Sequence, residues 1–425
     1  MTRELRDSGV GWIGDTPADW SVVPARALFG ERKQKSSATD VHLTPSQRYG
    51  VLPQAEYMEI TGNKVVLNLS GADNMRHVEA GDYVSHLRSF QGGLEFAGIP
   101  GKVSAAYTVL KPKVALEPRF FKYLFKSDLY VQALQTTTDQ LRDGQSIRYG
   151  QFALIPLPRP ALEEQRAIAD YLDRETAQID AFIAKNEQLI TLLTERRAAA
   201  ISYCVLKGLR AESELASTGQ AWLGDIPAHW KVVPWKAVFR DRRTRAYPED
   251  VHLTPSQRHG VLPQADYMRL TGTRVVLNLT APSDMKHVEP DDLVSHLRSF
   301  QGGLELSAVS GKVSMAYSVF RPLGDLLPTY SRYLLKCARF VEALQTTTDQ
   351  LRDGQSIRAK ELSILRYPVP PAAEQIEIAE HLDEMTGRVD SAVKTAQRSV
   401  TLASERRAAL ISAAVTGKID VGVAV

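Results

Sequence analysis

Three short segments of the chain carry side chains that form forked hydrogen bonds. The first covers residues 44–48 and continues to Gln54, the second covers residues 86–93, and the third covers residues 140–148. Arginine reads guanine bidentately, glutamine reads adenine, aspartate accepts from cytosine, and serine or threonine suits bases or phosphates. The paired glycines at 92–93 would expose backbone amides to a phosphate. This combination predicts hydrogen bonding to nucleic acid rather than covalent chemistry.

Each of these segments occurs a second time, 210 residues further along the chain. We take their polar and glycine residues as candidate DNA contacts. In the first copy they are Thr44, Ser46, Gln47, Arg48, Arg88, Ser89, Gln91, Gly92, Gly93, Arg142, Asp143, Gln145, Ser146 and Arg148. In the second copy they are Thr254, Ser256, Gln257, Arg258, Arg298, Ser299, Gln301, Gly302, Gly303, Arg352, Asp353, Gln355, Ser356 and Arg358.

Structural explanations compete with this interpretation at several positions. Arg88 and Gln91 fit the surface of an ordinary strand equally well. The 140–148 segment could be a hydrogen-bonded loop that orders the approach to the proline-rich stretch after it. Lysines 111, 113, 122 and 126 suit phosphates, but a solvated helix face is the default interpretation for them.

The chain is an internal duplication, and its two copies align 210 residues apart without insertions or deletions. Between residues 41–148 and their copies at 251–358, 70 of 108 positions are identical. A duplication this regular predicts an approximate internal twofold axis, like that of a homodimer whose subunits were fused. Such a molecule suits a twofold partner, and duplex DNA is the commonest one.

Bulk composition narrows the class only slightly. The chain has 425 residues, 44% hydrophobic content and a net charge of +3, values that are ordinary for a globular protein of two to four domains. Residues 11–150 hold 16 basic against 14 acidic side chains, and residues 221–360 hold 19 against 14. The first ten residues lack the apolar core of a signal peptide, and no apolar run reaches membrane-spanning length. We therefore expect a cytoplasmic protein that does not associate with a membrane.

Catalytic motifs are missing from the sequence. The nearest lookalike of a phosphate loop, at residues 101–103, has Phe96 where the first glycine belongs and lacks the Ser/Thr needed for magnesium. No Gly-rich cofactor loop precedes an Asn/Asp-Pro-Pro-aromatic motif, and no carboxylate cluster suits a nuclease metal. The two cysteines, Cys204 and Cys337, have no counterparts in the other copy and are expected to be buried small hydrophobes. We expect neither a cofactor nor a metal.

Each copy follows the same order of elements. A motif with two tryptophans around a Gly/Pro turn opens it, at 12–20 and 222–230, and we expect a packed structural corner there. A mixed segment follows, with strands expected at 64–69, 82–87 and 106–110. Helices are expected at 118–130 and 328–340. These features predict two compact α/β domains.

A proline-rich stretch then precedes a long helix of about 40 residues in each copy. We expect Leu172, Ile179, Asn186, Leu193 and Ala200 in one heptad row of the first helix and Glu175, Phe182, Leu189 and Arg196 in the other. The second helix has its heptad rows at the equivalent positions, 210 residues later. Two such helices related by a twofold axis would pack antiparallel and hold the domains apart. The alternative is that each helix packs on its own domain.

Several motifs together carry a resemblance. These are WxGxxPxxW, the segment GDYVSHLRSFQGG…GKVSAAYTVL, the stretch PLPRPALEEQRAIADYLD, the helix end LLTERRAAAIS, and the closing SERRAALISAAVTGKID. In this order, and repeated, they resemble the specificity subunit of Type I restriction-modification systems over nearly the whole chain. The resemblance implies an α+β protein with two similar target-recognition domains separated by two long antiparallel coiled-coil helices.

The resemblance also implies a division of labour. Domains at 1–155 and 211–365 would each recognise one half of a split site on double-stranded DNA. Spacer helices at 156–210 and 366–425 would dock methyltransferase subunits, two of them, which motor-nuclease subunits then join. The chain itself would be non-catalytic.

The two recognition segments are unusually alike. The long helical stretches 161–200 and 371–410 share only 15 of 40 positions, whereas in the family the helices are the similar parts and the recognition domains differ. We therefore expect both domains to recognise nearly the same half-sequence, in a near-palindromic site with an unspecified spacer.

Two other functions remain open from the residues alone. The same domains could serve a stand-alone DNA-binding regulator, although the long helices are then longer than needed. A hydrolase built on Asp82, His86 and Ser89 is a weaker alternative, because no nucleophile-elbow or oxyanion context surrounds these residues.

Overall fold

The computed structural model divides into two compact units. Unit 1 comprises Met1–Glu187 and Arg398–Val425, and unit 2 comprises Gln188–Gln397. The structure describes residues 3–63, 75–85, 93–136, 147–257, 259–275, 285–295, 304–347 and 357–422. Each unit therefore contains one copy of the mixed segment, the beginning of the long helix that follows it, and the end of the long helix of the other copy.

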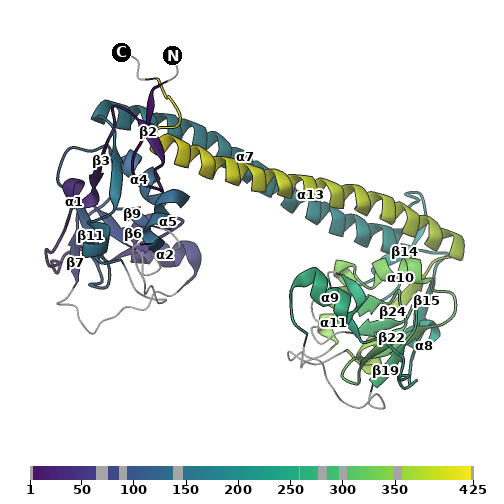
Figure 1. The fold of residues 1–425 in the computed structure, drawn as a ribbon. Coiled ribbons are helices and arrows are strands. Elements are labelled where there is room, and N and C mark those ends of the chain that lie inside the picture. Colours follow the sequence, from purple (N-terminus) through teal and green to yellow (C-terminus); the bar gives the residue numbers. More distant parts are fainter. Residues whose placement is uncertain are drawn as a thin grey trace. The chain divides into compact units, whose positions relative to one another are not determined.

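Unit 1 is made of short strands and short helices that precede a long helix (Figure 1). Its strands are β1 (Leu5–Asp7), β2 (Asp15–Pro17), β3 (Ser21–Pro24), β4 (Phe29–Glu31), β5 (Leu43–Ser46), β6 (Gly50–Pro53), β7 (Arg76–Val78), β8 (Tyr83–Ser85), β9 (Leu94–Phe96), β10 (Gly101–Val103), β11 (Val109–Pro112) and β12 (Pro156–Arg159). Its helices are α1 (Ala25–Leu28), α2 (Gln54–Thr61), α4 (Pro118–Lys126), α5 (Asp128–Thr136), α6 (Tyr149–Phe152) and the first part of α7 (Leu162–Lys207).

Unit 2 repeats this order. Its strands are β13 (Leu215–Ser217), β14 (Asp225–Pro227), β15 (Lys231–Pro234), β16 (Phe239–Asp241), β17 (Leu253–Ser256), β18 (Gly260–Pro263), β19 (Met285–Val288), β20 (Leu293–Ser295), β21 (Leu304–Leu306), β22 (Gly311–Ser314), β23 (Val319–Pro322) and β24 (Arg366–Val369). Its helices are α8 (Trp235–Val238), α9 (Gln264–Thr271), α10 (Pro328–Leu334), α11 (Ala338–Thr346), α12 (Ala359–Leu362) and the first part of α13 (Ala372–Val415).

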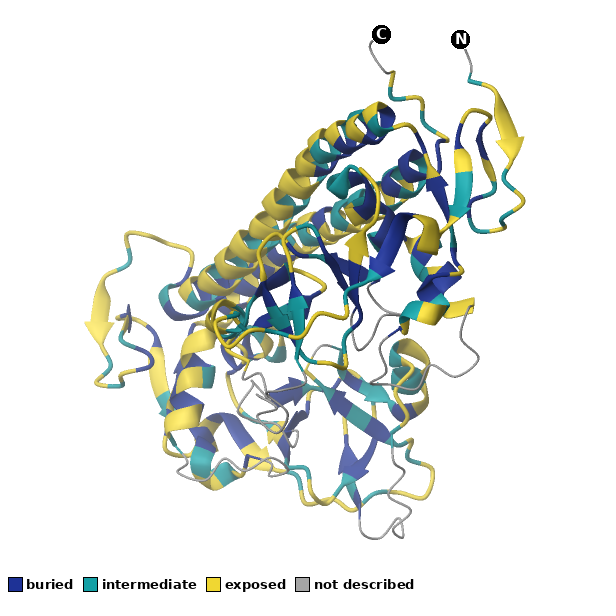
Figure 2. Ribbon diagram, turned by 90° about the vertical axis from the view of Figure 1, so that its left-hand side faces the viewer, coloured by how far each residue is buried: buried dark blue, intermediate teal, exposed yellow. Residues whose placement is uncertain are grey.

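An antiparallel sheet of four strands forms the centre of each unit. Its order is β4-β11-β8-β9 in unit 1 and β16-β23-β20-β21 in unit 2, so β4 and β16 are edge strands. Side chains of successive residues in a strand point to opposite faces, so one face of the sheet can be apolar. In unit 1 this face packs Phe29 and Tyr83 against Phe125 of α4, with ring centroids 5.4 and 5.2 Å from that of Phe125. Figure 2 shows that buried residues follow the strands and one side of the helices.

The helix expected at 118–130 is interrupted at one residue. α4 ends at Lys126 and α5 begins at Asp128, because Ser127 takes an extended conformation between them. Its hydroxyl accepts a hydrogen bond from the amide of Tyr130, as an N-cap residue does. The expected strands at 82–87 and 106–110 correspond to β8 and β11, whereas the one expected at 64–69 lies outside the described residues.

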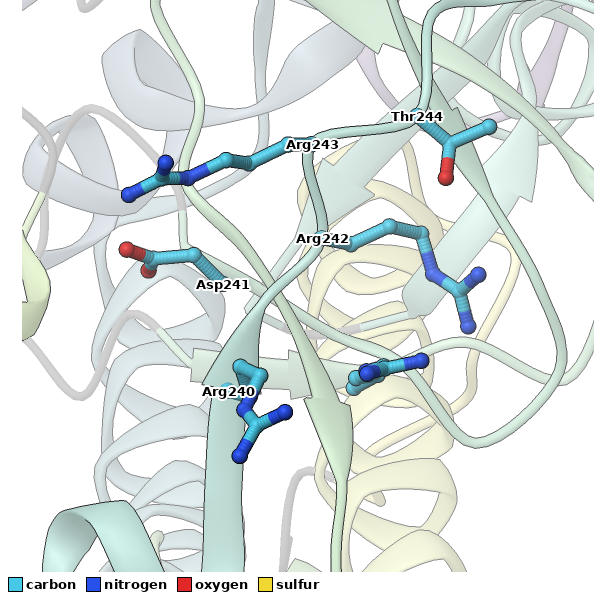
Figure 3. A pocket seen from close by; sticks show the side chains of 6 residues that line it. Arg240, Asp241, Arg242, Arg243 and Thr244 are labelled. Atoms are coloured by element: carbon cyan, nitrogen blue, oxygen red, sulfur yellow. The ribbon is translucent and has the colours of Figure 1, made fainter.

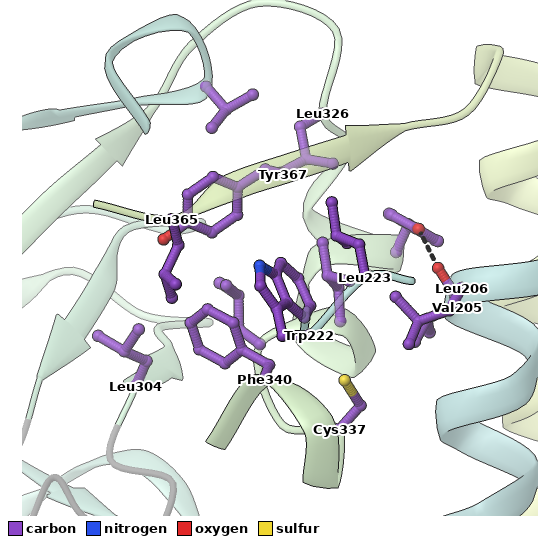
Figure 4. Packing of buried hydrophobic residues seen from close by; sticks show 14 of the residues in the cluster. Val205, Leu206, Trp222, Leu223, Leu304, Leu326, Cys337, Phe340, Leu365 and Tyr367 are labelled. Carbon is purple, nitrogen blue, oxygen red and sulfur yellow. Dashed lines mark hydrogen bonds between the residues drawn. The ribbon is translucent and has the colours of Figure 1, made fainter. Parts of the chain in front are cut away.

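The tryptophan motifs form packed corners, as predicted. Trp20 and Trp230 are 1% and 5% exposed, and the indole Nε1–H of each donates to a glutamate at the start of the long helix, Glu164 or Glu374, over 2.9 Å. Figure 4 shows the first tryptophan of the unit 2 motif, Trp222, packed among Phe340, Tyr367 and Leu223. The two cysteines are buried and unpaired, as expected.

The end of each long helix completes the core of the unit in which it lies. Ile411, Ala414 and Val415 of α13 belong to the core cluster of unit 1, together with Leu172 of α7. Cys204, Val205 and Leu206 of α7 belong to that of unit 2. Figure 4 shows Val205 and Leu206 in this cluster. Within unit 1, Arg407 donates to Asp180, and within unit 2, Arg197 pairs with Asp390. Asp180 and Asp390 are equivalent residues of the two copies, and so are Arg197 and Arg407. The aspartate comes from α7 in unit 1 and from α13 in unit 2.

One heptad row of the long helices is confirmed and the other is wrong by one residue. Leu172 is buried and Ile179, Asn186, Leu193 and Ala200 are half-buried, as expected. The partner row is Thr176, Ile183, Ile190 and Arg197, whereas Phe182 and Leu189 are 48% and 45% exposed. Together the two rows form the buried stripe of the helix, in which successive residues are alternately four and three positions apart. The predicted second row contains the large apolar residue Phe182, but in the structure this side chain lies on the helix surface.

The mixed helix and strand content and the two long helices agree with the predicted fold class. The pseudo-twofold axis, the spacer role of the helices and the domain boundaries at 155, 210 and 365 stay predictions.

Candidate nucleic-acid interface

The first predicted segment forms a tight hairpin between β5 and β6. Ser46 pairs with Gly50 across the hairpin, so Gln47, Arg48 and Tyr49 form its turn. All three turn residues are exposed, and the Arg48 guanidinium lies 5.5 Å from the centre of the Tyr49 ring. Ser46 itself is buried and its hydroxyl accepts from the Tyr49 amide. The turn therefore presents a glutamine and a stacked arginine outward on a short, registered hairpin.

A half-buried lysine, Lys126, holds this turn against the helix layer. The Lys126 ammonium donates to the Gln47 carbonyl over 2.7 Å and to Glu95 of β9 over 2.5 Å. Glu95 is 3% exposed, so its charge is compensated inside the unit. Lys126, which sequence analysis assigned to a solvated helix face by default, is thus a positioning residue for the turn.

The second copy has the same hairpin in unit 2. Ser256 pairs with Gly260, and Gln257 is exposed in the turn. Thr44 and Thr254 are half-buried within β5 and β17. His259 takes the place of Tyr49, with its ring 6.5 Å from that of Tyr267. Arg258 lies outside the described residues.

Gly93 owes its identity to packing inside unit 1. Its φ is +71°, and a Cβ there would lie 1.9 Å from the backbone carbonyl oxygen of Phe125 at the end of α4. Only glycine permits this approach of two backbone segments. The phosphate contact expected at this glycine stays a prediction.

The third segment is described only at its end. Arg148 and Arg358 are exposed, and each precedes a short helix, α6 or α12. Their backbone amides donate to Gln151 and Glu361 three residues later, which fixes where these helices begin. The other candidate contacts lie outside the described residues. They are Arg88, Ser89, Gln91, Gly92, Arg142, Asp143, Gln145 and Ser146 in the first copy, and Arg298, Ser299, Gln301, Gly302, Gly303, Arg352, Asp353, Gln355 and Ser356 in the second.

Asp82, the acid of the hydrolase alternative, is committed to a structural ion pair. Arg32 donates to both of its oxygens, over 2.6 and 3.0 Å, and the Glu79 amide donates to one of them. Hydrogen bonding to Asp82 raises the pKa of Arg32, so the guanidinium stays charged. An aspartate held in this way is not placed to orient a catalytic histidine.

A basic surface in unit 2 lies outside the segments that the sequence predicted as contacts, apart from Arg358. Two adjoining hollows of about 530 and 670 Å³ flank β16 and the loop after it. Their lining includes Arg240, Arg242, Arg243, Arg245, Arg321 and Arg358. Figure 3 shows that Arg240, Arg242 and Arg243 extend from this single stretch of chain. The run RDRRTR at 240–245 was the available signal, but Arg321 and Arg358 join it only through the fold.

Neither a metal site nor a membrane segment is found in the part of the chain that the structure describes. There, no three His, Cys, Asp or Glu side chains are grouped as metal ligands. No described helix is both long and apolar enough to cross a bilayer.

Glu305 gives unit 2 a pH-dependent stability. It is 1% exposed, and only one of its carboxylate oxygens has a partner among the described residues, Lys336 at 2.5 Å. Burial raises the pKa of Glu305 from 4.5 to about 7. Because the folded state holds this proton more tightly than the unfolded state, the contribution of Glu305 to stability is fully present below pH 4.5 and is lost as the pH rises through about 7.

We expect Glu305→Gln to remove this decline, worth about 3 kcal/mol in the free energy of unfolding. Urea unfolding of the two proteins at several pH values between 4.5 and 8 measures it, with the expected divergence growing toward neutral pH. Parallel curves across this range would contradict the assignment. Lys336→Met is the control, because it removes the ammonium that favours the ionised carboxylate and should steepen the decline.

Comparison with known proteins gives a consistent set of relatives. No family model matches the chain. The chain is 22% identical over 331 residues to the specificity subunit of the Type I restriction enzyme EcoKI of Escherichia coli K12, covering 73% of this chain and 68% of the relative. It is 19% identical over 432 residues to the putative Type I restriction enzyme MjaX specificity subunit of Methanocaldococcus jannaschii, covering 96% of both. The comparisons support a Type I restriction specificity subunit.

Solved structures agree at the level of the fold. A chain from a structure of a type I restriction-modification system, described for its complex assembly and conformational transition, aligns with a TM-score of 0.64, covering 95% of this chain and 99% of the other, at 15% identity. The HsdS subunit from Thermoanaerobacter tengcongensis aligns with a TM-score of 0.54, covering 95% and 98%, also at 15% identity. The resemblance to Type I restriction specificity subunits, inferred from the sequence motifs, is thus confirmed by these relatives.

Proposed function

We propose that this chain is the non-catalytic DNA-specificity subunit of a Type I restriction-modification complex. Each target-recognition domain binds one half of a bipartite, near-palindromic site on double-stranded DNA, and the two long helices separate the domains. Methyltransferase subunits, two per chain, dock on the helices, and motor-nuclease subunits join that complex. The chain needs no cofactor of its own, because the other subunits supply the chemistry.

The observation that carries this proposal is the pair of matching polar turns. Gln47 and Gln257 occupy the same place in registered hairpins of the two units. Glutamine presents a donor and an acceptor together, which is the pattern that reads adenine in the major groove. Two turns with the same polar residue support recognition of similar half-sites.

The long helices carry apolar side chains that support docking of another chain. In unit 1, Phe182 of α7 and Leu402 of α13 are 48% and 54% exposed. They line a shallow groove of about 460 Å³ with Ile179 and Ala403. Exposed apolar side chains gathered in one groove favour a protein contact over solvent.

The site itself can be determined by reconstitution. The full chain is expressed with a Type I methyltransferase subunit in a host that lacks DNA methylation, and the methylated motif is determined across the genome. We expect two half-sequences that are the same or nearly the same on opposite strands, separated by unspecified bases. Two unrelated half-sequences would exclude the near-palindrome. DNA binding without co-purification of a methyltransferase would favour the stand-alone regulator.

The role of the turn can be tested at one side chain. Arg48→Ala is expected to weaken binding to the target duplex on the order of 10-fold to 100-fold, since a bidentate arginine contributes about 1–3 kcal/mol to base discrimination. Fluorescence anisotropy with target and non-target duplexes measures it. Because Arg48 is exposed and stacks only on Tyr49, the thermal unfolding midpoint should not move. The matched control is Arg26→Ala, an exposed arginine of α1 outside the predicted segments.

A further inference from the structure

We infer that the arginine surface around β16 binds the phosphodiester backbone of DNA and that unit 1 has no equivalent of the same strength. The two near-twin domains would then share base recognition but differ in affinity. This inference rests on the proposed DNA-binding function and adds to it a second, unequal contact.

Five of the six guanidinium groups on this surface have no ion-pair partner among the described residues. Arg240, Arg243, Arg245, Arg321 and Arg358 are all exposed. Among the described residues, no carboxylate lies within the 4.0 Å of an ion pair from any of these five. Arg242 is different, because it is paired with Asp292 and Glu289. The surface therefore carries several positive charges that are available to a ligand, beside one carboxylate, Asp241, which lines both hollows.

Two of these arginines face each other directly. Arg240 of β16 and Arg321 of β23 are opposite partners in the antiparallel register. Like charges at opposite positions of a strand pair repel each other and destabilise the sheet. An anion bound between them removes this cost. Arginine also suits phosphate in particular, because its fork donates two parallel hydrogen bonds to phosphate oxygens.

Unit 1 lacks the facing pair, because Gly30 stands at the position of Arg240, whereas Lys33, Lys35, Lys111 and Arg148 keep a positive charge at the positions of Arg243, Arg245, Arg321 and Arg358. Gly30 stands opposite Lys111, so no like-charged pair forms. Glu31 pairs with Arg76 over 2.7 Å and lies 3.9 Å from Lys33, which compensates the positive charge locally. In unit 2 the equivalent acid is the shorter Asp241, and the amine of Lys286 donates to the Tyr317 carbonyl instead. The basic side chains of unit 2 thus remain exposed to a ligand.

The position and shape of the surface favour a polymer backbone. Arg358 lines the larger hollow and is the last residue of the segment 350–358, the second copy of the segment 140–148 in which DNA contacts are predicted. Arg240 extends from the edge strand β16, and Arg243 extends from the loop that follows it (Figure 3). Small-molecule sites instead enclose their ligand in largely apolar walls. Several exposed guanidinium groups along one stretch of chain can bind successive phosphates of a duplex.

The test compares matched variants of the full chain. Arg243→Gln/Arg321→Gln in unit 2 is paired with Lys33→Gln/Lys111→Gln, which changes the equivalent positions of unit 1. Binding to the target duplex and to an unrelated duplex is measured by anisotropy from 50 to 300 mM salt. The slope of log affinity against log salt falls by about 0.9 for each phosphate that the protein no longer neutralises. We expect the slope of the unit 2 variant to fall by about 2 on both duplexes, and that of the unit 1 variant to fall by less than half as much.

Each other outcome overturns the inference in a distinguishable way. Equal reductions of the slope in both variants would exclude the difference between the units. An unchanged slope in the unit 2 variant, with target binding intact, would place the phosphate contacts elsewhere and leave the proposed function standing. A wild-type chain that binds neither duplex would remove the proposed function as well. Aggregation of the unit 2 variant with unchanged affinity of its monodisperse fraction would assign the arginines to protecting the edge strand.

Discussion

Gly93→Ala is expected to lower the free energy of unfolding by about 4 kcal/mol. An L-residue at a left-handed φ costs about 1–2 kcal/mol, and forcing an extra methyl group into a packed core costs about 1–3 kcal/mol more. Both apply here, since φ is +71° and the new Cβ would lie 1.9 Å from the Phe125 carbonyl oxygen. That oxygen belongs to the backbone at the end of α4, so it cannot move aside as a flexible side chain would. Urea unfolding at neutral pH measures the loss.

A second glycine separates the two contributions. Gly62 has a φ of +67° at the end of α2, but a Cβ there would meet nothing within 4 Å. Gly62→Ala should therefore cost only the backbone term of about 1 kcal/mol. Equal losses for the two variants would show that the contact with Phe125 contributes nothing. If instead Gly93→Ala kept its stability and lost DNA affinity, the glycine would serve a phosphate rather than the core.

Asp292→Ala is expected to destabilise unit 2 by about 3 kcal/mol. Asp292 is fully buried, accepts from Arg242 over 2.9 Å, and also accepts from the Glu289 amide over 2.8 Å. Burial raises the pKa of Asp292, against the effect of Arg242, so desolvation of this carboxylate is costly. Removing one partner of a buried ion pair leaves the other charge poorly compensated, which costs about 3–5 kcal/mol. We choose the lower end because Glu289 still faces Arg242 at 2.7 Å.

The matched variant in unit 1 is Asp82→Ala, because Arg32 holds Asp82 with the same geometry. Differential scanning calorimetry of each variant should lower the transition of one unit and leave the other in place. Replacing both partners, as in Arg242→Met/Asp292→Leu, should recover much of the loss, since the isolated charge is removed. A double variant as unstable as Asp292→Ala would mean that the ion pair stabilises the unit by more than charge compensation.

The sequence predicted features that depend on residues close together in the chain. The Gln47–Tyr49 turn lies between two strands of one hairpin, so the polar residues between them mark its exposed tip. The tryptophan corners follow from a nine-residue motif that recurs in both copies. The helical part of the prediction failed at single positions. Ser127 ends α4, although nothing in the apolar pattern marks a helix end there. Phe182 lies outside the row of half-buried residues, because the buried row of the helix is shifted by one residue from the predicted one.

By itself, then, the sequence determined the duplication, the two long helices, the absence of catalytic motifs and the place of the polar turns, because repeats, periodicity and spacing are local properties of the chain. Only the tertiary structure decided that Arg240 faces Arg321, that Gly93 lies against Phe125, and that the ends of α7 and α13 complete the cores of units 2 and 1. These contacts join residues tens to hundreds of positions apart. They arise from strand register and core packing, which minimise the free energy of the whole unit and leave no signature in any short stretch of sequence.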